Sequence, residues 1–177
     1  MSTTDFIGTQ AYNWWRTLVP ERKEDSTDKQ RLIKRGALAQ LRHSGNAAEM
    51  MFIPEFRLLC NMLGSNPENL NKSFHVARLL AHVRENAYQK VARALGPQAD
   101  GKGPRMSEAR FRRLLQARDQ EDIDKRLTRA IKMLEGKVDV ADLANAVWWW
   151  NDRTRRDWAF QYFNAPLPET DSAPQAA

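Results

Sequence analysis

The apolar residues of this chain recur every three or four positions, and this spacing dictates helices almost throughout. The clearest stretch is residues 120–134, where Ile123, Leu127, Ile131 and Leu134 fall on one face of a helix. Alternation of apolar and polar residues, the pattern of a half-buried strand, is nearly absent. The spacing therefore predicts an all-α protein built as a helical bundle.

Turn residues and capping residues divide the chain into separate helices. Asn, Ser or Asp precedes several of the periodic stretches, as expected for N-caps, and Gly or Pro follows them. The predicted helices cover about residues 5–18, 29–42, 47–51, 54–63, 67–95, 107–118 and 120–134, with two more after Asp139 and Asn151. The stretch 67–95 is expected to be one long helix because its apolar residues form a continuous stripe.

The densest cluster of helix-breaking residues, Gly96–Pro104, predicts a boundary between two lobes, because it holds three Gly and two Pro. We expect an N-terminal helical lobe at 1–95, a linker loop at 96–105 and a C-terminal helical lobe at 106–165, stacked together. Residues 166–177 contain three prolines and no periodicity, and are predicted to be a disordered tail.

Positive charge carried mainly by arginine is the second strong feature. The chain has a net charge of +6, and because its last twelve residues hold two acids, the remainder carries +8. Arginine outnumbers lysine by 19 to 9, and its planar guanidinium suits two-pronged contact with phosphate. This balance predicts a polyanionic partner, although a plain soluble basic protein would have the same charge.

Recognisable catalytic and metal-binding motifs are missing. The sequence has no GxxxxGK[ST], GxGxxG, HExxH or CxxC pattern. Cys60 lies in an apolar helical context that predicts a buried side chain, and His75 and His82 have no carboxylate or cysteine pair at metal-ligand spacing. We therefore expect no catalytic residues, no metal and no cofactor.

The same composition bears on location. A single cysteine excludes an internal disulfide and suits a reducing cytosol, and no stretch of about 18 apolar residues exists. The first ten residues lack the basic-then-apolar pattern of a signal peptide. We expect a cytoplasmic protein without a membrane partner.

Two consecutive predicted helices each present a row of arginines opposite their apolar face. Arg110 and Arg113 lie three residues apart on the first helix, and Arg118 is at the end of that helix. Arg126 and Arg129 repeat this spacing on the second helix. An acid four residues before Arg126 is placed to neutralise it, whereas Arg110, Arg113 and Arg129 have none. An ordinary solvated surface is the alternative, but the rows favour phosphate contact.

Three adjacent tryptophans, Trp148, Trp149 and Trp150, precede Arg153 and Arg155. They fit either a stacking platform for single-stranded nucleic acid or a core and subunit interface. Because each helical step turns the side chain by about 100°, the three cannot all face one way. We favour the core or interface role, with the nearby arginines as phosphate contacts.

Five short motifs occur in an order that resembles the CasB family, the small subunit of the type I-E CRISPR surveillance complex called Cascade. They are the pair Trp14-Trp15, RGALAQLRH at 35–43, FRLL at 56–59, SEARFRRLL at 107–115 and the turn from Trp149 to Arg155. The resemblance spans Phe6 to Phe163. It implies an all-helical, two-lobed subunit, present in two copies, that contacts the backbone subunits, the large subunit, the guide RNA and both DNA strands.

The resemblance also implies a function without nuclease activity, which is to hold the R-loop while base pairing reads the sequence. The basic positions of the family match Arg42, Arg110, Arg113, Arg129 and Arg153. Two departures concern these contacts. His43 stands where many relatives have a second arginine, and Asp152 places an acid beside Arg153.

Two alternatives remain at this stage. A protein-interaction adaptor would use the tryptophans as its anchor and the arginines against acidic partners. A helical enzyme would need a cluster of carboxylates or histidines to carry metal ions. The predicted nucleic-acid contacts are Arg35, Arg42, Arg110, Arg113, Arg118, Arg126, Arg129, Arg153 and Arg155, and the predicted interface residues are Trp148, Trp149 and Trp150.

Overall fold

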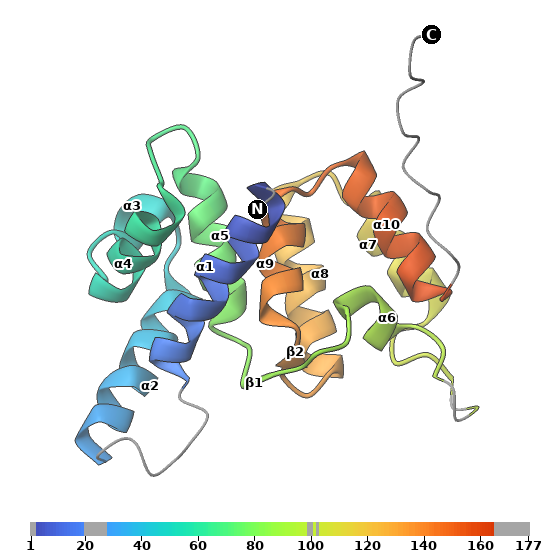
Figure 1. The fold of residues 1–177 in the computed structure, drawn as a ribbon, viewed down its shortest axis with the longest axis horizontal. Helices are drawn as coiled ribbons and strands as arrows, with labels where there is room; N and C mark the ends of the chain where they lie inside the picture. Colours follow the sequence, from blue (N-terminus) through green and yellow to red (C-terminus); the bar gives the residue numbers. More distant parts are fainter. Residues whose placement is uncertain (1–2, 20–27, 99–100, 102, 165–177) are drawn as a thin grey trace, which may run out of the picture.

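The computed structural model describes residues 3–19, 28–98, 101 and 103–164, and these residues form an all-α fold with one very small sheet (Figure 1). The elements are α1 (Thr3–Leu18), α2 (Asp28–His43), α3 (Ala47–Met50), α4 (Pro54–Leu63), α5 (Leu70–Leu80), β1 (Glu85–Asn86), α6 (Val91–Leu95), α7 (Glu108–Gln116), α8 (Gln120–Met133), β2 (Lys137–Val138), α9 (Val140–Trp148) and α10 (Asp152–Tyr162). The predicted helical bundle is confirmed.

Helix α1 organises the core, because it packs along α9 and also contacts α4 and α2 (Figure 1). Its Trp14 and Trp15 side chains are fully buried. A buried indole N–H requires an acceptor, and Trp14 Nε1 donates to the carbonyl of Glu55 at 2.8 Å while Trp15 Nε1 donates to that of Val83 at 3.3 Å. These two bonds attach α1 to α4 and to the segment after α5.

The predicted long helix over 67–95 is wrong at its beginning. The side chain of Asn66 accepts hydrogen bonds from the backbone N–H groups of Glu68 and Asn69, at 2.9 and 3.2 Å. These bonds close a turn in place of a first helical turn. Helix α5 consequently begins at Leu70.

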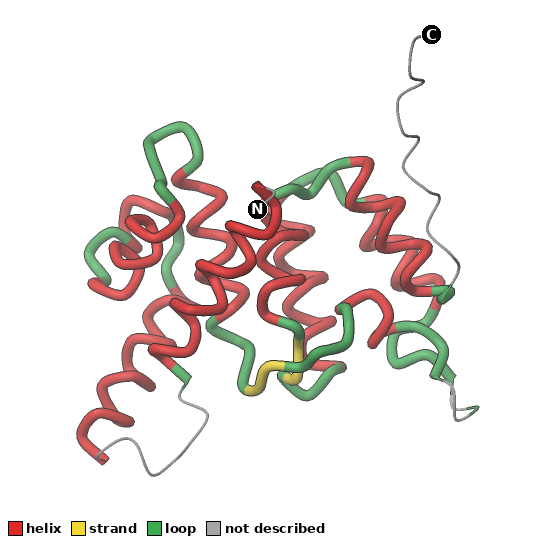
Figure 2. Tube along the Cα trace, in the orientation of Figure 1, coloured by secondary structure: helices red, strands yellow, loops and turns green. Residues whose placement is uncertain are grey.

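The same prediction is also wrong at its end, because α5 stops at Leu80. The N–H groups of Arg84 and Glu85 donate to the carbonyl of Gly136, at 2.8 and 3.2 Å, and β1 then pairs in parallel with β2. Figure 2 shows the two strands side by side in yellow. A distant segment thus supplies the acceptors that a continuous helix would have found locally.

The helices after this point begin where the sequence indicated. Asp119, Asp139 and Asn151 cap α8, α9 and α10 by accepting a backbone N–H three residues later. Ser107 occupies the N-cap position of α7, but its hydroxyl makes no capping bond to the described residues.

Helix α10 packs against α6 with very close backbone contact (Figure 1). A Cβ added to Gly96 would overlap the carbonyl oxygen of Tyr162, so only glycine fits there. The Tyr162 ring stacks on Phe111 of α7 at 4.1 Å, and its hydroxyl donates to the carbonyl of Met106. The lobe boundary at 96–105 stays a prediction, and the predicted disordered tail lies outside the described residues.

Candidate nucleic-acid interface

Helices α7 and α8 form a groove of about 300 Å³ in which four arginines surround a floor of Met106, Leu114 and Met133. Phe111 and Leu114 of α7 turn inward, as do the apolar residues of α8, so the cations on the opposite faces point outward. Four predicted contacts come together here, with Arg110 and Arg113 from α7 facing Arg126 and Arg129 from α8.

Three of these four arginines carry uncompensated charge. Arg126 Nε donates to Asp122 Oδ2 at 2.8 Å, one helical turn earlier. Arg110, Arg113 and Arg129 make no ion pair with any residue that the structure describes. The groove therefore presents three free cations and one that shares its charge with an acid.

A second hollow, of about 250 Å³, lies on the other side of α8. Arg129 lines it as well, together with Lys132 of α8 and with Arg42 and Arg78 from α2 and α5. A third hollow, of about 180 Å³, adjoins it through Arg42 and Lys132 and adds Arg84. Because Arg129 borders the groove and the second hollow alike, the positive charge continues across α8.

We call this continuous region the basic surface. Its cations are Arg42, Arg78, Arg84, Arg110, Arg113, Lys125, Arg126, Arg129 and Lys132, and the acids Glu121, Asp124 and Glu135 lie among them. Lys125 pairs with Glu121 at 2.8 Å. Sequence reasoning did not assign Arg78 and Arg84 to the site. Arg78 lies opposite the apolar stripe of α5, which was an available signal. Arg84 lies after the end of α5 at Leu80, in a segment that the sequence had predicted to be helical.

A hydrogen bond within the protein orients the side chain of Arg42. Its Nε donates to the carbonyl of Ala81 at 2.7 Å, which orients the guanidinium between α2 and the end of α5. Burial, and then the nearby charge of Arg84, lower its pKa. No carboxylate among the described residues pairs with Arg42, so this half-buried cation lacks a counterion.

His82 reports the same positive environment. The pKa of His82 is lowered from 6.5 to about 4. Burial is the largest cause, and the charges of Arg42, Lys132, Arg78 and His43 lower the pKa further. His82 is therefore neutral at pH 7. The carboxylate of Asp124 lines the second hollow too, but it is engaged by His75 Nδ1 at 2.7 Å and is 4.0 Å from Arg78 Nη1.

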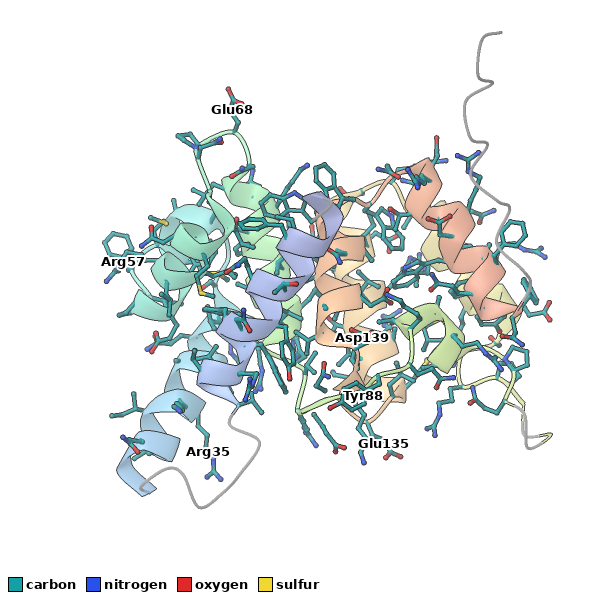
Figure 3. The ribbon with its side chains drawn as sticks, in the orientation of Figure 1. Arg35, Arg57, Glu68, Tyr88, Glu135 and Asp139 are labelled. Carbon is teal, nitrogen blue, oxygen red and sulfur yellow. The ribbon has the colours of Figure 1, made fainter. Side chains whose placement is uncertain are left out.

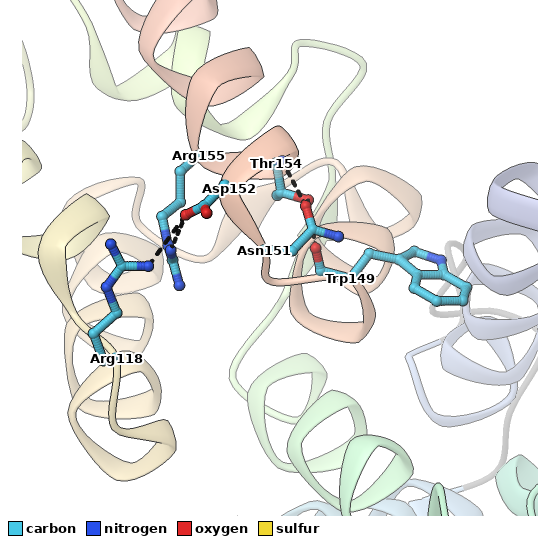
Figure 4. Close-up of polar contacts among 6 residues, drawn as sticks. All are labelled: Arg118, Trp149, Asn151, Asp152, Thr154 and Arg155. Carbon is cyan, nitrogen blue, oxygen red and sulfur yellow. Dashed lines mark hydrogen bonds and ion pairs between the residues drawn. The ribbon is translucent and has the colours of Figure 1, made fainter.

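Three other predicted arginines lie around the start of α10, outside these hollows, and Figure 4 shows two of them, Arg118 and Arg155. Arg118 Nη1 and Arg155 Nη1 both contact Asp152 Oδ1, at 3.2 and 2.7 Å. Arg153 is exposed and makes no ion pair within the described part of the chain. The acid beside Arg153 thus pairs with Arg118 and Arg155 instead, and the charge of one of these two arginines remains in excess.

Helix α2 carries the remaining prediction and one departure. Arg35 is exposed and lies two turns from Arg42, beyond the hollows (Figure 3). His43 Nδ1 lies 2.7 Å from the carbonyl oxygen of Ala39 in the same helix. The ring therefore bonds to its own backbone at the position where an arginine was expected.

The three adjacent tryptophans occupy different environments. Trp148 is buried, at 6% exposure, whereas Trp149 and Trp150 are half-buried and pack against the core. Trp150 meets Trp158 edge to face at 5.2 Å, and Lys72 Nζ lies 4.8 Å from the centre of the Trp149 ring. They form no flat exposed platform, so packing dominates their contacts.

Metal-ligating side chains do not gather in groups of three or more within the described residues. Cys60 is buried, which raises the pKa of its thiol. None of the described helices is long and apolar enough to cross a membrane.

The described residues thus form an all-α bundle in which clustered arginines line adjoining hollows, and such clusters are typical of proteins that bind polyanions. A family model described as CRISPR-associated protein Cse2 matches residues 37–163. The chain belongs to this family, which is the CasB family that the sequence motifs resembled. The match runs from the second half of α2 to the end of α10.

A solved structure gives the same picture of the fold. One chain of the crystal structure of E. coli Cascade bound to a PAM-containing dsDNA target matches with a TM-score of 0.60 and 21% sequence identity. The match covers 86% of this chain and 95% of that one. Among curated protein sequences, none matches the chain significantly.

Proposed function

We propose that this chain is a non-catalytic small subunit of a type I-E Cascade complex, in which the basic surface binds nucleic-acid backbone and stabilises the R-loop. The observation that carries the proposal is the continuity of unpaired cations across α8, from Arg113 to Arg42. Membership in the Cse2 family and the fold shared with a Cascade chain support the assembly in which this happens.

Small binding energies matter in this setting because the exchange of a DNA duplex for an RNA–DNA heteroduplex is nearly balanced. Each phosphate that a cation neutralises releases condensed counterions, which adds affinity without sequence preference. A few contacts along one strand are then enough to favour the open state. Base pairing with the guide RNA supplies the sequence specificity.

The predicted contacts divide by how freely each one meets a phosphate. Arg110, Arg113 and Arg129 make no ion pair with a described residue, so no such contact must break before they bind a phosphate. Arg42 is already oriented by its bond to the carbonyl of Ala81. Arg126 shares its charge with an acid and contributes less. The peripheral group, which makes weaker or strand-end contacts, is Arg35, Arg118, Arg153 and Arg155.

The rest of the assembly follows from family membership and belongs to the same proposal. Two copies act in the cytoplasm, next to the backbone subunits and the large subunit, and touch the guide RNA and the target and displaced strands. Within each copy, residues 96–105 join two helical lobes. Of the three predicted interface tryptophans, Trp149 and Trp150 contribute to subunit contact through their exposed edges, and the buried Trp148 supports Trp149 from the core.

The test compares guide-loaded complex reconstituted with this chain and without it. We expect the complete complex to bind target double-stranded DNA more tightly and to expose more of the displaced strand to single-strand-specific chemical modification. Equal affinity and equal strand opening in both complexes would overturn the proposal. Cleavage of DNA by the purified chain with added Mg²⁺ would overturn its non-catalytic part.

A further inference from the structure

An exposed apolar patch lies on the turn between α3 and α4 and on the first half of α4, at the opposite end of the molecule from α7 (Figure 1). Eight large apolar side chains are exposed among the described residues, and three of them fall within residues 51–58. They are Met51, Phe52 and Leu58, at 36%, 86% and 44% exposure. Pro54 is exposed between them.

Backbone hydrogen bonds order the turn that carries Phe52. The N–H of Phe52 donates to the carbonyl of Glu49 at 3.1 Å, and the N–H of Ile53 donates to that of Met50 at 2.9 Å, closing a tight turn. Ile53 and Met50 are buried on either side, so the ring is displayed on a fixed base. Because the backbone is already ordered, binding has to fix only the two side-chain torsions of Phe52, which limits the entropic cost.

Arg57 joins the turn to the outward face of α4. Its Nη1 donates to the carbonyl of Met51 at 2.8 Å, and it is adjacent in sequence to Leu58. Figure 3 shows Arg57 at the outer edge of the molecule, beside α3 and α4. No carboxylate among the described residues pairs with it. Its charge is therefore available to an acid on another molecule.

We propose that this patch docks the chain onto a protein subunit of the complex, one with an apolar pocket for Phe52 and a carboxylate for Arg57. The inference rests on the proposed function, because it presumes a multisubunit complex. Exposed aromatic, methionine and arginine side chains are enriched at the centres of protein interfaces. The patch has one cation, with Glu49 and Glu55 nearby, which disfavours phosphate as its occupant.

The patch and the basic surface are separate, so one chain engages protein and nucleic acid at the same time. In this arrangement the protein anchor is α3–α4, with the tryptophans at 148–150 in a secondary role because they are mostly packed inside.

The experiment measures binding of labelled chain to guide-loaded complex purified without it, in the absence of target DNA. We expect Phe52→Ala to weaken binding at least about tenfold, the loss that truncating an interface anchor produces. Because the lost contact is apolar, the fold-change should be the same at low and high salt, whereas the loss from Arg57→Glu should shrink as salt rises. Tyr88→Ala, at 93% exposure in the wild type, is the matched control and should bind normally.

Four results would overturn the inference. Wild-type chain that fails to bind the complex would defeat the proposed function and this inference together. Wild-type binding that Phe52→Ala leaves unchanged would defeat the inference alone. Loss of DNA capture without loss of docking would assign the patch to nucleic acid. A changed sedimentation of the free Phe52→Ala chain, with normal docking, would assign it to a second copy.

Discussion

Replacing Arg129 with alanine tests the basic surface where its two largest hollows meet. Arg129 is exposed and makes no ion pair with a described residue, so its removal takes away one phosphate contact and leaves no buried charge behind. Each neutralised phosphate of duplex DNA contributes about 0.9 to the slope of log affinity against log salt. The Arg129→Ala complex should therefore bind target DNA about 15-fold more weakly at about 50 mM salt, but only about 4-fold more weakly at about 200 mM.

The assay is a titration of target double-stranded DNA with reconstituted complex across this range of salt. Arg93→Ala is the matched control, because it removes the same charge from an arginine that bonds to the carbonyl of Pro97 outside the basic surface. Arg129→Lys should keep the salt slope while losing part of the affinity, since lysine cannot make the two-pronged contact. An unchanged slope in Arg129→Ala, or an equal loss in Arg93→Ala, would refute the reasoning. So would a changed preference for guide-matched sequence.

Three further predictions concern stability. The pKa of His82 falls from 6.5 in the unfolded chain to about 4 in the folded chain. Between pH 6.5 and about pH 4 the unfolded chain therefore binds more protons, and the free energy of unfolding should decline as the pH drops through this range. His82→Gln should flatten that decline in urea unfolding, and an unaltered pH profile would contradict this. Gly96→Ala should destabilise the fold by about 1–3 kcal/mol in thermal unfolding because its Cβ meets the Tyr162 carbonyl, whereas Gly36→Ala in open space on α2 should stabilise it by about 0.5–1 kcal/mol. Trp14→Ala should cost about 3–5 kcal/mol, and a smaller change in the denaturation midpoint than Gly96→Ala produces would contradict its place in the core.

The helices and the arginine rows of α7 and α8 could be predicted because both depend on local spacing. Apolar residues at intervals of three and four bury one face, and the cations between them must then point outward. The caps at Asp119 and Asp139 are equally local, since each side chain bonds to an N–H three residues ahead. The family resemblance rested on these same local patterns.

The structure of residues 67–95 could not be predicted from local sequence patterns. Their apolar spacing fits one helix, yet the carbonyl of Gly136, some fifty residues away, takes the N–H groups of Arg84 and Glu85. Val83 and Val91 are buried in either arrangement, so the pattern of burial alone could not distinguish them. A long-range backbone bond outweighed the helical preference.

The sequence by itself determined that this chain is helical, that its helices carry arginine rows and that it belongs with the Cse2 family. Only the tertiary structure decided which charges meet. It brings Arg42 and Arg129 to one hollow and pairs Asp152 with Arg118 and Arg155, leaving Arg153 without that acid. Helical periodicity gives the direction of a side chain about its own helix axis, whereas the distance between two charges depends on how separate helices pack.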